Sequence, residues 1–218
     1  MIHTMKLKSK SNIVFAVVAA DAVCFRIINE KLHVLLEKAP KYSPFPGEWA
    51  LVGGMLHPRE TAEEAVNRLL EERAGIKSIY KEQVYTFSKI DRDPRGRVVS
   101  IAYLVVASSN PQELKKADLE TEWMTVKSIP KLAYDHNEIL KNVLEKLKFN
   151  IFNTNIAKYL MRKEFTLSEL QNVYETVLGK NIDKRNFRKK ILSQDILKDL
   201  HKVRKEGVMR PAKIYIFK

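Results

Sequence analysis

A short segment rich in arginine and aspartate is the first place where this sequence offers binding chemistry. It reads Asp91-Arg92-Asp93-Pro94-Arg95-Gly96-Arg97 and lies between two stretches typical of strands. A guanidinium donates two parallel hydrogen bonds to a phosphate, and an aspartate accepts hydrogen bonds from sugar hydroxyls. The segment therefore fits a phosphorylated ligand, with Asp91, Arg92, Arg95 and Arg97 as binding residues. A solvated, self-neutralising hairpin tip explains the same composition equally well.

A second cluster of polar side chains lies on a basic helix near the C-terminus. Over residues 183–193 the spacing places Phe187, Ile191 and Leu192 on an inward face, and Asp183 suits the N-cap. A helix predicted over 167–178 ends at Gly179 just before it, so the two form a helix-turn-helix. Arginine and asparagine read base edges in the major groove, whereas other cations contact phosphates. We predict base contacts from Arg185 and Asn186, and phosphate contacts from Lys184, Arg188, Lys189 and Lys190.

The distribution of charge indicates a polyanionic partner for this part of the chain. Residues 149–218 carry 16 Lys+Arg against 7 Asp+Glu, so they hold +9 of the total net charge of +13. Two strand-like stretches around a basic loop predict a wing, whose cations are Arg204, Lys205, Arg210 and Lys213. The order helix, turn, helix and hairpin predicts a winged-helix domain over 149–218 that binds double-stranded DNA. An RNA-binding module is the alternative.

Another predicted helix has a glycine and a glutamate before it and an arginine within it, at fixed spacing along the chain. Gly54 is followed by Glu60, Arg68, Leu70, Glu72, Gly75 and Ile76, which resembles the Nudix box G-x5-E-x7-R-E-U-x-E-E-x-G-U, where U is apolar. In active Nudix enzymes this helix supplies carboxylates to Mg²⁺, which bridges a diphosphate while water attacks it. Thr61 and Glu64 predict a capping box at the start of the helix, which should run to about Ala74.

The box departs from the family pattern at two of three expected glutamates. Leu69 stands where the first is expected and Arg73 where the last is, so only Glu72 is in register. Glu71 does not substitute, because successive helical residues point about 100° apart. Like unit charges about 4 Å apart repel by roughly 4 kcal/mol at an effective dielectric near 20, so Arg73 disfavours a cation. We expect no catalytic residue in the degenerate box, no metal site and no required cofactor; Mg²⁺ matters only if hydrolase activity remains.

The first 148 residues predict a mixed strand and helix domain. Strands are expected over 13–23, 32–36, 49–52, 83–88, 98–106 and 122–126, and helices over 61–74 and 137–147; a further helix over 154–161 opens the second domain. The sequence lacks an apolar run of about 18 residues, so no membrane partner is expected. The single cysteine, Cys24, lies in apolar sequence and forms no internal disulfide, which favours a cytoplasmic protein.

Both halves together resemble the Nudix-related transcriptional regulators, a bacterial family that joins a Nudix domain to a winged helix. Besides the box, the resemblance rests on A-Y-D-H at 133–136, F-T-L-S-E-L-Q at 165–171, K-R-N-F-R-K at 184–189, R-P-A-K-I-Y at 210–215 and D-R-D-P-R-G-R-V-V-S at 91–100. It implies an α+β fold, with a Nudix α/β/α sandwich and mixed sheet over 1–148, and a homodimer on palindromic operators. Nudix ligands lie over the sheet near the box, which adds Glu48, Trp49, Arg59 and Arg73 to the predicted ligand-binding residues.

The sequence therefore predicts a repressor-type transcriptional regulator that senses a small metabolite in a catalytically degenerate Nudix domain. Some members of the family respond to ADP-ribose and control NAD metabolism, and others respond to L-arabinose and control sugar use. The identity of the effector stays open at this stage, as does the direction of its effect on DNA affinity. The alternative is an Mg²⁺-dependent Nudix hydrolase of ADP-ribose or a related nucleoside diphosphate derivative.

Overall fold

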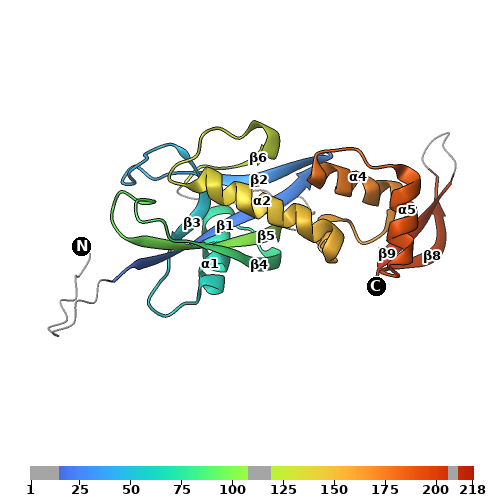
Figure 1. Ribbon diagram of the computed structural model, residues 1–218, viewed down its shortest axis with the longest axis horizontal. Coiled ribbons are helices and arrows are strands. Elements are labelled where there is room, and N and C mark those ends of the chain that lie inside the picture. Colours follow the sequence, from blue (N-terminus) through green and yellow to red (C-terminus); the bar gives the residue numbers. More distant parts are fainter. Residues whose placement is uncertain (1–14, 108–118, 206–210) are drawn as a thin grey trace.

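The structure, a computed structural model, describes residues 15–107, 119–205 and 211–218. Figure 1 shows a long molecule with a sheet domain at one end and a helix-and-hairpin domain at the other. Helix α2 (His136–Asn153) crosses the sheet and points toward the second domain. None of the helices in the described ranges is long and apolar enough to cross a membrane.

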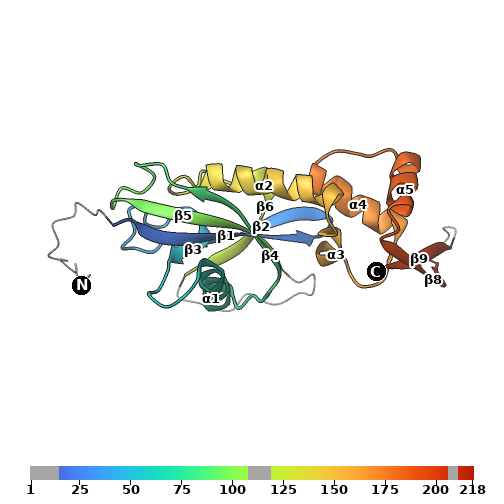
Figure 2. The ribbon, with the colours of Figure 1, turned by 60° about the horizontal axis from the view of Figure 1, so that its bottom comes forward.

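A mixed sheet forms the first domain, with six strands among the described residues in the order β4-β5-β1-β3-β2-β6. β1 runs parallel to β5, and the other neighbours are antiparallel. Helices α1 (Ala62–Ala74) and α2 cover opposite faces (Figure 2), which confirms the predicted α/β/α sandwich. The strands are β1 (Val17–Ile28), β2 (Lys31–Lys38), β3 (Trp49–Met55), β4 (Ser78–Phe87), β5 (Val98–Ala107) and β6 (Thr121–Thr125), followed by the short helix η1 (Val126–Ser128).

The central strand β1 is apolar along most of its length because both faces of the sheet are covered. Helices cover both sides of the sheet, so a central strand reads as a nearly continuous apolar run. β1 extends five residues past the predicted end at Val23 and closes on a tight hairpin, in which Asn29 and Glu30 have φ of 48° and 59°. Asp21 interrupts the apolar run although it is only 4% exposed. A buried carboxylate in a central strand needs partners, and these define the pocket described below.

Helix α1 begins and ends at the predicted residues. The Thr61 side chain accepts a hydrogen bond from the Glu64 amide, and the Glu64 carboxylate accepts one from the Thr61 amide. Gly75 ends the helix in the left-handed conformation, with φ of 67°. The preceding pair Gly53-Gly54 lies inside β3 and not in a turn after it.

The second domain is a winged helix, as predicted. It contains α3 (Ala157–Leu160), β7 (Phe165–Thr166), α4 (Leu167–Leu178), α5 (Lys184–Ser193), β8 (Leu197–Arg204) and β9 (Ala212–Phe217). The strands form a three-stranded sheet in the order β7-β9-β8. One hydrophobic cluster continues from beneath α2 into this domain and includes Ile151, Leu160, Tyr174 and Phe187, so the two domains pack against each other.

Two predicted helices and one predicted core residue differ in the structure. The helix predicted over 137–147 continues to Asn153, so the predicted boundary after Lys148 lies inside α2. The helix predicted over 154–161 is limited to α3, because the Thr154 hydroxyl donates to the Asn150 carbonyl and accepts from the Ile156 amide, bonds that compete with helix formation. On α5, Leu192 does not face the core and is 48% exposed.

Candidate ligand pocket and nucleic-acid interface

A buried ion pair joins the arginine-rich loop to the start of α2. Arg92 donates from Nε and Nη2 to the two carboxylate oxygens of Asp135, at 2.9 and 2.7 Å. Its Nη2 also lies 3.7 Å from Asp21, and the Arg92 side chain is 4% exposed. One buried guanidinium thus compensates two carboxylates that come from distant segments of the chain. Arg92 therefore links the arginine-rich loop to β1 and to the start of α2.

The Asp21 carboxylate has two further partners, Ser100 and His136. The Ser100 hydroxyl donates to its Oδ2, and the Nε2 of His136 lies 3.7 Å from its Oδ1. His136 Nδ1 accepts from the Leu51 amide at 3.0 Å, so a neutral ring carries its proton on Nε2, toward Asp21. Burial lowers the pKa of His136. A Cβ at Gly53 would overlap Asp21 Oδ1, so the glycine lets β3 approach this carboxylate.

These residues lie around a cavity of about 360 Å³ beside the Nudix box. Of the predicted ligand-binding residues, Arg73, Arg92 and Arg95 line it. Five others do not, namely Glu48, Trp49, Arg59, Asp91 and Arg97. Arg97 donates to the carbonyls of Ser88 and Lys89 and closes its own loop, while Asp91 lies 3.7 Å from Lys89.

Arg73 faces a buried glutamate at the edge of this cavity. Its Nε lies 3.8 Å from Glu37 Oε2, and both are buried polar atoms without a hydrogen-bond partner within the described residues. Burial raises the pKa of Glu37 to about 7, against the opposing effects of Arg73 and of the Gly53 amide, which donates to the carboxylate. The pair therefore has unsatisfied hydrogen-bonding capacity that a ligand's phosphate or hydroxyl groups can meet.

Tyr134 and Arg95 also line this cavity and form its aromatic wall. Tyr134 packs edge-on against Phe45, with ring centroids 4.7 Å apart. The Arg95 guanidinium lies 5.6 Å from the centroid of the Tyr134 ring and pairs through two hydrogen bonds with Asp93. A flat ring beside guanidinium groups suits a ligand that carries both a planar base and phosphates.

The residues of the box do not fit a Mg²⁺ site. Arg68 donates to both oxygens of Glu60, at 2.9 and 2.6 Å, and to Glu72 at 3.3 Å. These hydrogen bonds hold the pKa of Glu60 at about 2. Leu69 is 2% exposed, and a Cβ at Gly54 would stand 3.0 Å from its Cδ2, so an apolar side chain fills the position of the first expected ligand. The glutamates that remain neutralise an arginine, and Arg73 adds a positive charge.

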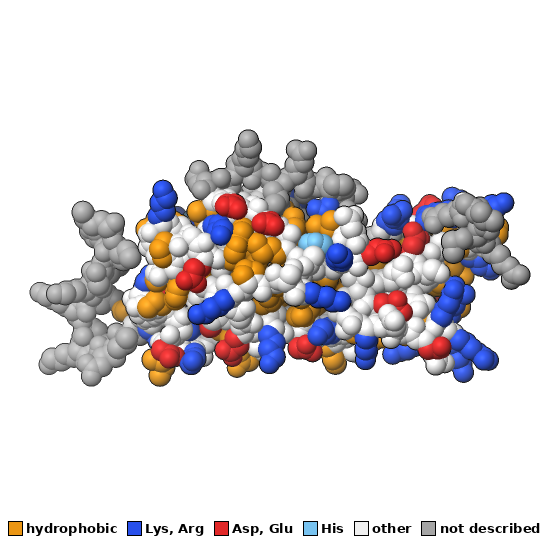
Figure 3. All heavy atoms as spheres, turned by 90° about the horizontal axis from the view of Figure 1, so that it is seen from above, with side chains coloured by type: hydrophobic (Ala, Val, Ile, Leu, Met, Phe, Trp, Pro, Cys, Tyr) orange, Lys and Arg blue, Asp and Glu red, His pale blue; other side chains and the backbone are white. Residues whose placement is uncertain are grey.

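The first turn of α5, which is predicted to contact nucleic acid, is exposed to solvent. Lys184, Arg185, Asn186 and Lys189 are exposed, and Asp183 caps the helix by accepting from the Asn186 amide. Figure 3 shows Lys and Arg side chains projecting around the outer end of this domain. Arg185 and Asn186 stay predicted base contacts, and Lys184 and Lys189 stay predicted phosphate contacts.

Four of the other predicted DNA contacts have intramolecular partners: Lys190, Arg188, Arg204 and Lys213. Lys190 lies over the Phe152 ring, and Arg188 is half-buried with Nη2 3.4 Å from the Ser168 hydroxyl. In the wing, Arg204 binds both oxygens of Glu169 and Lys213 pairs with Asp199. Lys205 is exposed, and Arg210 lies outside the described residues.

Side chains of α4 fix the turn before α5. Gln171 donates to the Ile182 carbonyl and to Glu175, and Glu175 accepts from the Ile182 amide at 2.8 Å. Gly179 ends α4 with φ of 69°. Because these bonds fix the turn, the first turn of α5 projects from the domain in a defined direction.

Several pocket residues escaped sequence reasoning, namely Asp21, Glu37, Tyr134 and His136. Asp21 and Glu37 carried a usable signal, since each is a charged residue within an otherwise apolar strand. Tyr134 and His136 belong to the A-Y-D-H segment, which marked the family resemblance but was not connected to the arginine loop.

Comparisons with known proteins agree with both halves of this architecture. A family model for the NUDIX domain matches residues 18–147, and one for the NrtR DNA-binding winged helix domain matches residues 157–217. The chain is also 32% identical over 214 residues to the "ADPR responsive transcriptional repressor NtrR" of Acinetobacter baylyi, which covers 95% of this chain and 84% of that relative. This chain belongs to the NrtR family of Nudix-related transcriptional regulators.

Two solved structures of a family member from Shewanella oneidensis are similar to it. One is NrtR complexed with a 27mer DNA, with a TM-score of 0.75, 29% identity and coverage of 92% of this chain and 93% of that chain. The other is the NUDIX domain of that protein complexed with ADP ribose, with a TM-score of 0.55, 30% identity and coverage of 62% and 90%. The resemblance inferred from the sequence is confirmed.

Proposed function

We propose that this chain is a cytoplasmic, homodimeric transcriptional repressor that binds operator DNA through its winged helix and senses ADP-ribose in its Nudix pocket. The relative from A. baylyi is named as responsive to this nucleotide, and the S. oneidensis Nudix domain binds it. The pocket offers what such a ligand needs: guanidinium groups for the diphosphate, carboxylates for ribose hydroxyls and an aromatic wall for the base.

One observation supports the proposal most strongly. The pocket is lined by charged residues, but the helix beside it lacks two of the metal ligands expected from the Nudix box. Leu69 fills one position, and Arg73 brings a positive charge to the other. A guanidinium binds a diphosphate without a metal, which supports recognition without hydrolysis.

We expect no Mg²⁺-dependent cleavage of ADP-ribose by this chain, because Leu69 and Arg73 cannot hold the ion that hydrolysis requires. Release of AMP, followed by chromatography over hours with Mg²⁺ in excess, tests this directly. Turnover that requires Mg²⁺ and disappears in Glu72→Gln would establish the hydrolase instead.

The effector is identified by calorimetry with ADP-ribose, NAD and L-arabinose. We expect ADP-ribose to bind and Arg73→Gln to weaken it about tenfold or more, because charge-assisted hydrogen bonds to a phosphate contribute about 1.5–3 kcal/mol. Arg59→Gln is the matched control, since Arg59 is exposed and does not line the cavity. Binding of L-arabinose alone, or equal affinities in the two variants, would contradict the assignment.

The affinity for ADP-ribose should fall about three- to tenfold between pH 6 and pH 8. Burial raises the pKa of Glu37 to about 7, so this carboxyl is largely protonated at pH 6 and ionised at pH 8. The ionised form offsets the charge of Arg73 and repels the diphosphate. The same calorimetric titration at each pH measures the effect, and Glu37→Gln should remove it. An unaltered pH profile in that variant would show that Glu37 does not set it.

A further inference from the structure

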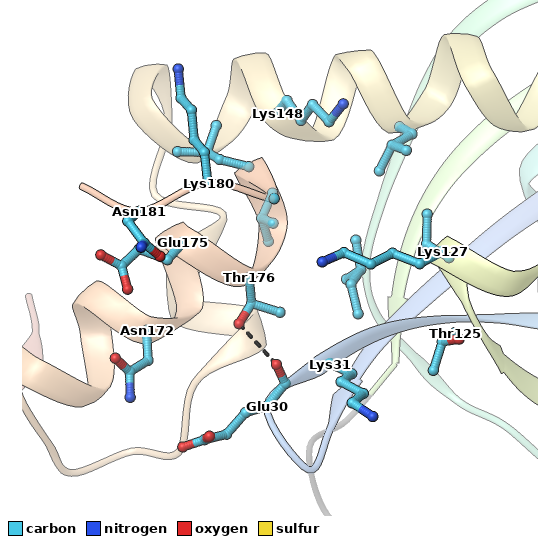
Figure 4. Close-up of a pocket in the computed structure, with 16 residues that line it drawn as sticks. Glu30, Lys31, Thr125, Lys127, Lys148, Asn172, Glu175, Thr176, Lys180 and Asn181 are labelled. Carbon is cyan, nitrogen blue, oxygen red and sulfur yellow. Dashed lines mark hydrogen bonds between the residues drawn. The ribbon is translucent and has the colours of Figure 1, made fainter.

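A second cavity, of about 620 Å³, lies between the sensor domain and the winged helix. The β1–β2 hairpin, η1 and α2 form one side, and the end of α4 with the following turn forms the other (Figure 4). Its volume lies within the range of about 300–1,000 Å³ typical of small-molecule sites. It shares no lining residue with the Nudix pocket. We call it the interdomain groove.

Lysines dominate the charge around the interdomain groove, where Lys31, Lys127, Lys148 and Lys180 face only two carboxylates, Glu30 and Glu175. Glu175 is already engaged, since it accepts hydrogen bonds from Gln171 and from the Ile182 amide. Lys148 pairs with Glu145 outside the groove. The other three lysines have no ion pair within the described ranges, so the groove carries uncompensated positive charge.

Lys127 is the lysine best placed to meet a ligand. It extends from η1 across the groove toward Thr176 on α4 (Figure 4). Beside it, the groove is lined by apolar side chains from both domains, among them Val126, Leu144 and Val177. A cation beside an apolar surface suits a ligand with an anionic group on a flat or apolar body.

We propose that the interdomain groove binds a phosphate-bearing metabolite with a planar body, of the nucleotide class, as a second small-molecule site. Lys127 binds the phosphate, Lys180 adds positive charge at the edge of the groove, and the apolar side chains contact the planar body. Such a ligand bridges the two domains and adds to the contacts that already join them, which include the shared hydrophobic cluster and the hydrogen bond from the Thr176 hydroxyl to the Glu30 carbonyl at 3.0 Å. Gly179, Lys180 and Asn181 of the turn before α5 line the groove, so the ligand lies beside the segment that orients the predicted DNA-reading helix.

The test uses the full-length protein with methyl labelling and AMP as the probe. Saturable shifts are expected at the methyl groups of Leu144, Val177 and Leu178. The double variant Lys127→Gln/Lys180→Gln should raise the dissociation constant at least tenfold. Lys141→Gln is the matched control, because Lys141 is an exposed lysine of α2 that does not line the groove. Its affinity should equal that of the unmodified chain.

A variant of the Nudix pocket separates the two sites. In Arg73→Gln the AMP-dependent shifts at the groove should be unchanged. Inorganic phosphate should bind at least tenfold more weakly than AMP, because it lacks the planar body. The proposal is overturned if AMP gives no saturable shifts at the groove or if the shifts disappear in Arg73→Gln. It is also overturned if the double lysine variant binds AMP as the unmodified chain does, or if inorganic phosphate binds equally well.

Discussion

Arg185→Ala is expected to lower the affinity for operator DNA by about 1–3 kcal/mol, which is roughly 5- to 150-fold. Arg185 lies on the exposed first turn of α5 and forms no ion pair within the described residues. An arginine side chain can donate two hydrogen bonds to a guanine edge, and alanine can donate none. Fluorescence anisotropy at a fixed salt concentration, with an operator selected from random duplexes, measures the change.

Two further variants separate base reading from simple charge. Arg185→Lys keeps the charge but not the paired donors, so it should retain the salt dependence of binding and lose discrimination between operator and random DNA. Arg59→Ala removes an exposed arginine of the sensor domain and should leave operator affinity unchanged. If Arg185→Ala kept both the affinity and the discrimination of the unmodified chain, α5 would not be the reading helix.

Arg92→Met is expected to lower the free energy of unfolding by about 3–5 kcal/mol, the usual cost of breaking a buried ion pair by removing one partner. The variant leaves the buried Asp21 and the partly buried Asp135 without the guanidinium that both face. Methionine fills much of the same volume, so the loss reports charge and hydrogen bonds more than packing. Urea unfolding measures it through a lower transition midpoint at an unchanged slope.

Neighbouring changes supply the controls for Arg92. Arg97→Met, in the same loop, removes hydrogen bonds of an exposed side chain to two carbonyls and should cost no more than about 1.5 kcal/mol. Adding Asp135→Asn to Arg92→Met should recover part of the stability, because it removes one of the uncompensated charges. If Arg92→Met unfolded at the midpoint of the unmodified chain, the buried cluster would not contribute to stability.

Local signals in the sequence predicted most of the fold. The capping box at Thr61, the stops at Gly75 and Gly179 and the cap at Asp183 depend on residues within one helical turn, so spacing alone reveals them. The degenerate box followed in the same way from residues within one helix.

The ligand pocket depends on contacts between distant segments, and there sequence reasoning was incomplete. Arg92 was predicted to bind ligand but is held mainly by Asp135, 43 residues away. Side-chain direction within the loop decided which arginines line the pocket, since Arg95 lies against Tyr134 while Arg97 turns back onto its own loop. A pattern of residue types does not carry that information.

Operator affinity measured with and without saturating ADP-ribose shows whether a ligand in the Nudix pocket controls DNA binding. We predict a change in the dissociation constant of about fivefold or more, as expected for a coupling free energy of 1–3 kcal/mol. The change should require a higher ADP-ribose concentration in Arg73→Gln and the usual concentration in Arg59→Gln. An operator affinity that is the same with and without ADP-ribose would show that this nucleotide does not control DNA binding.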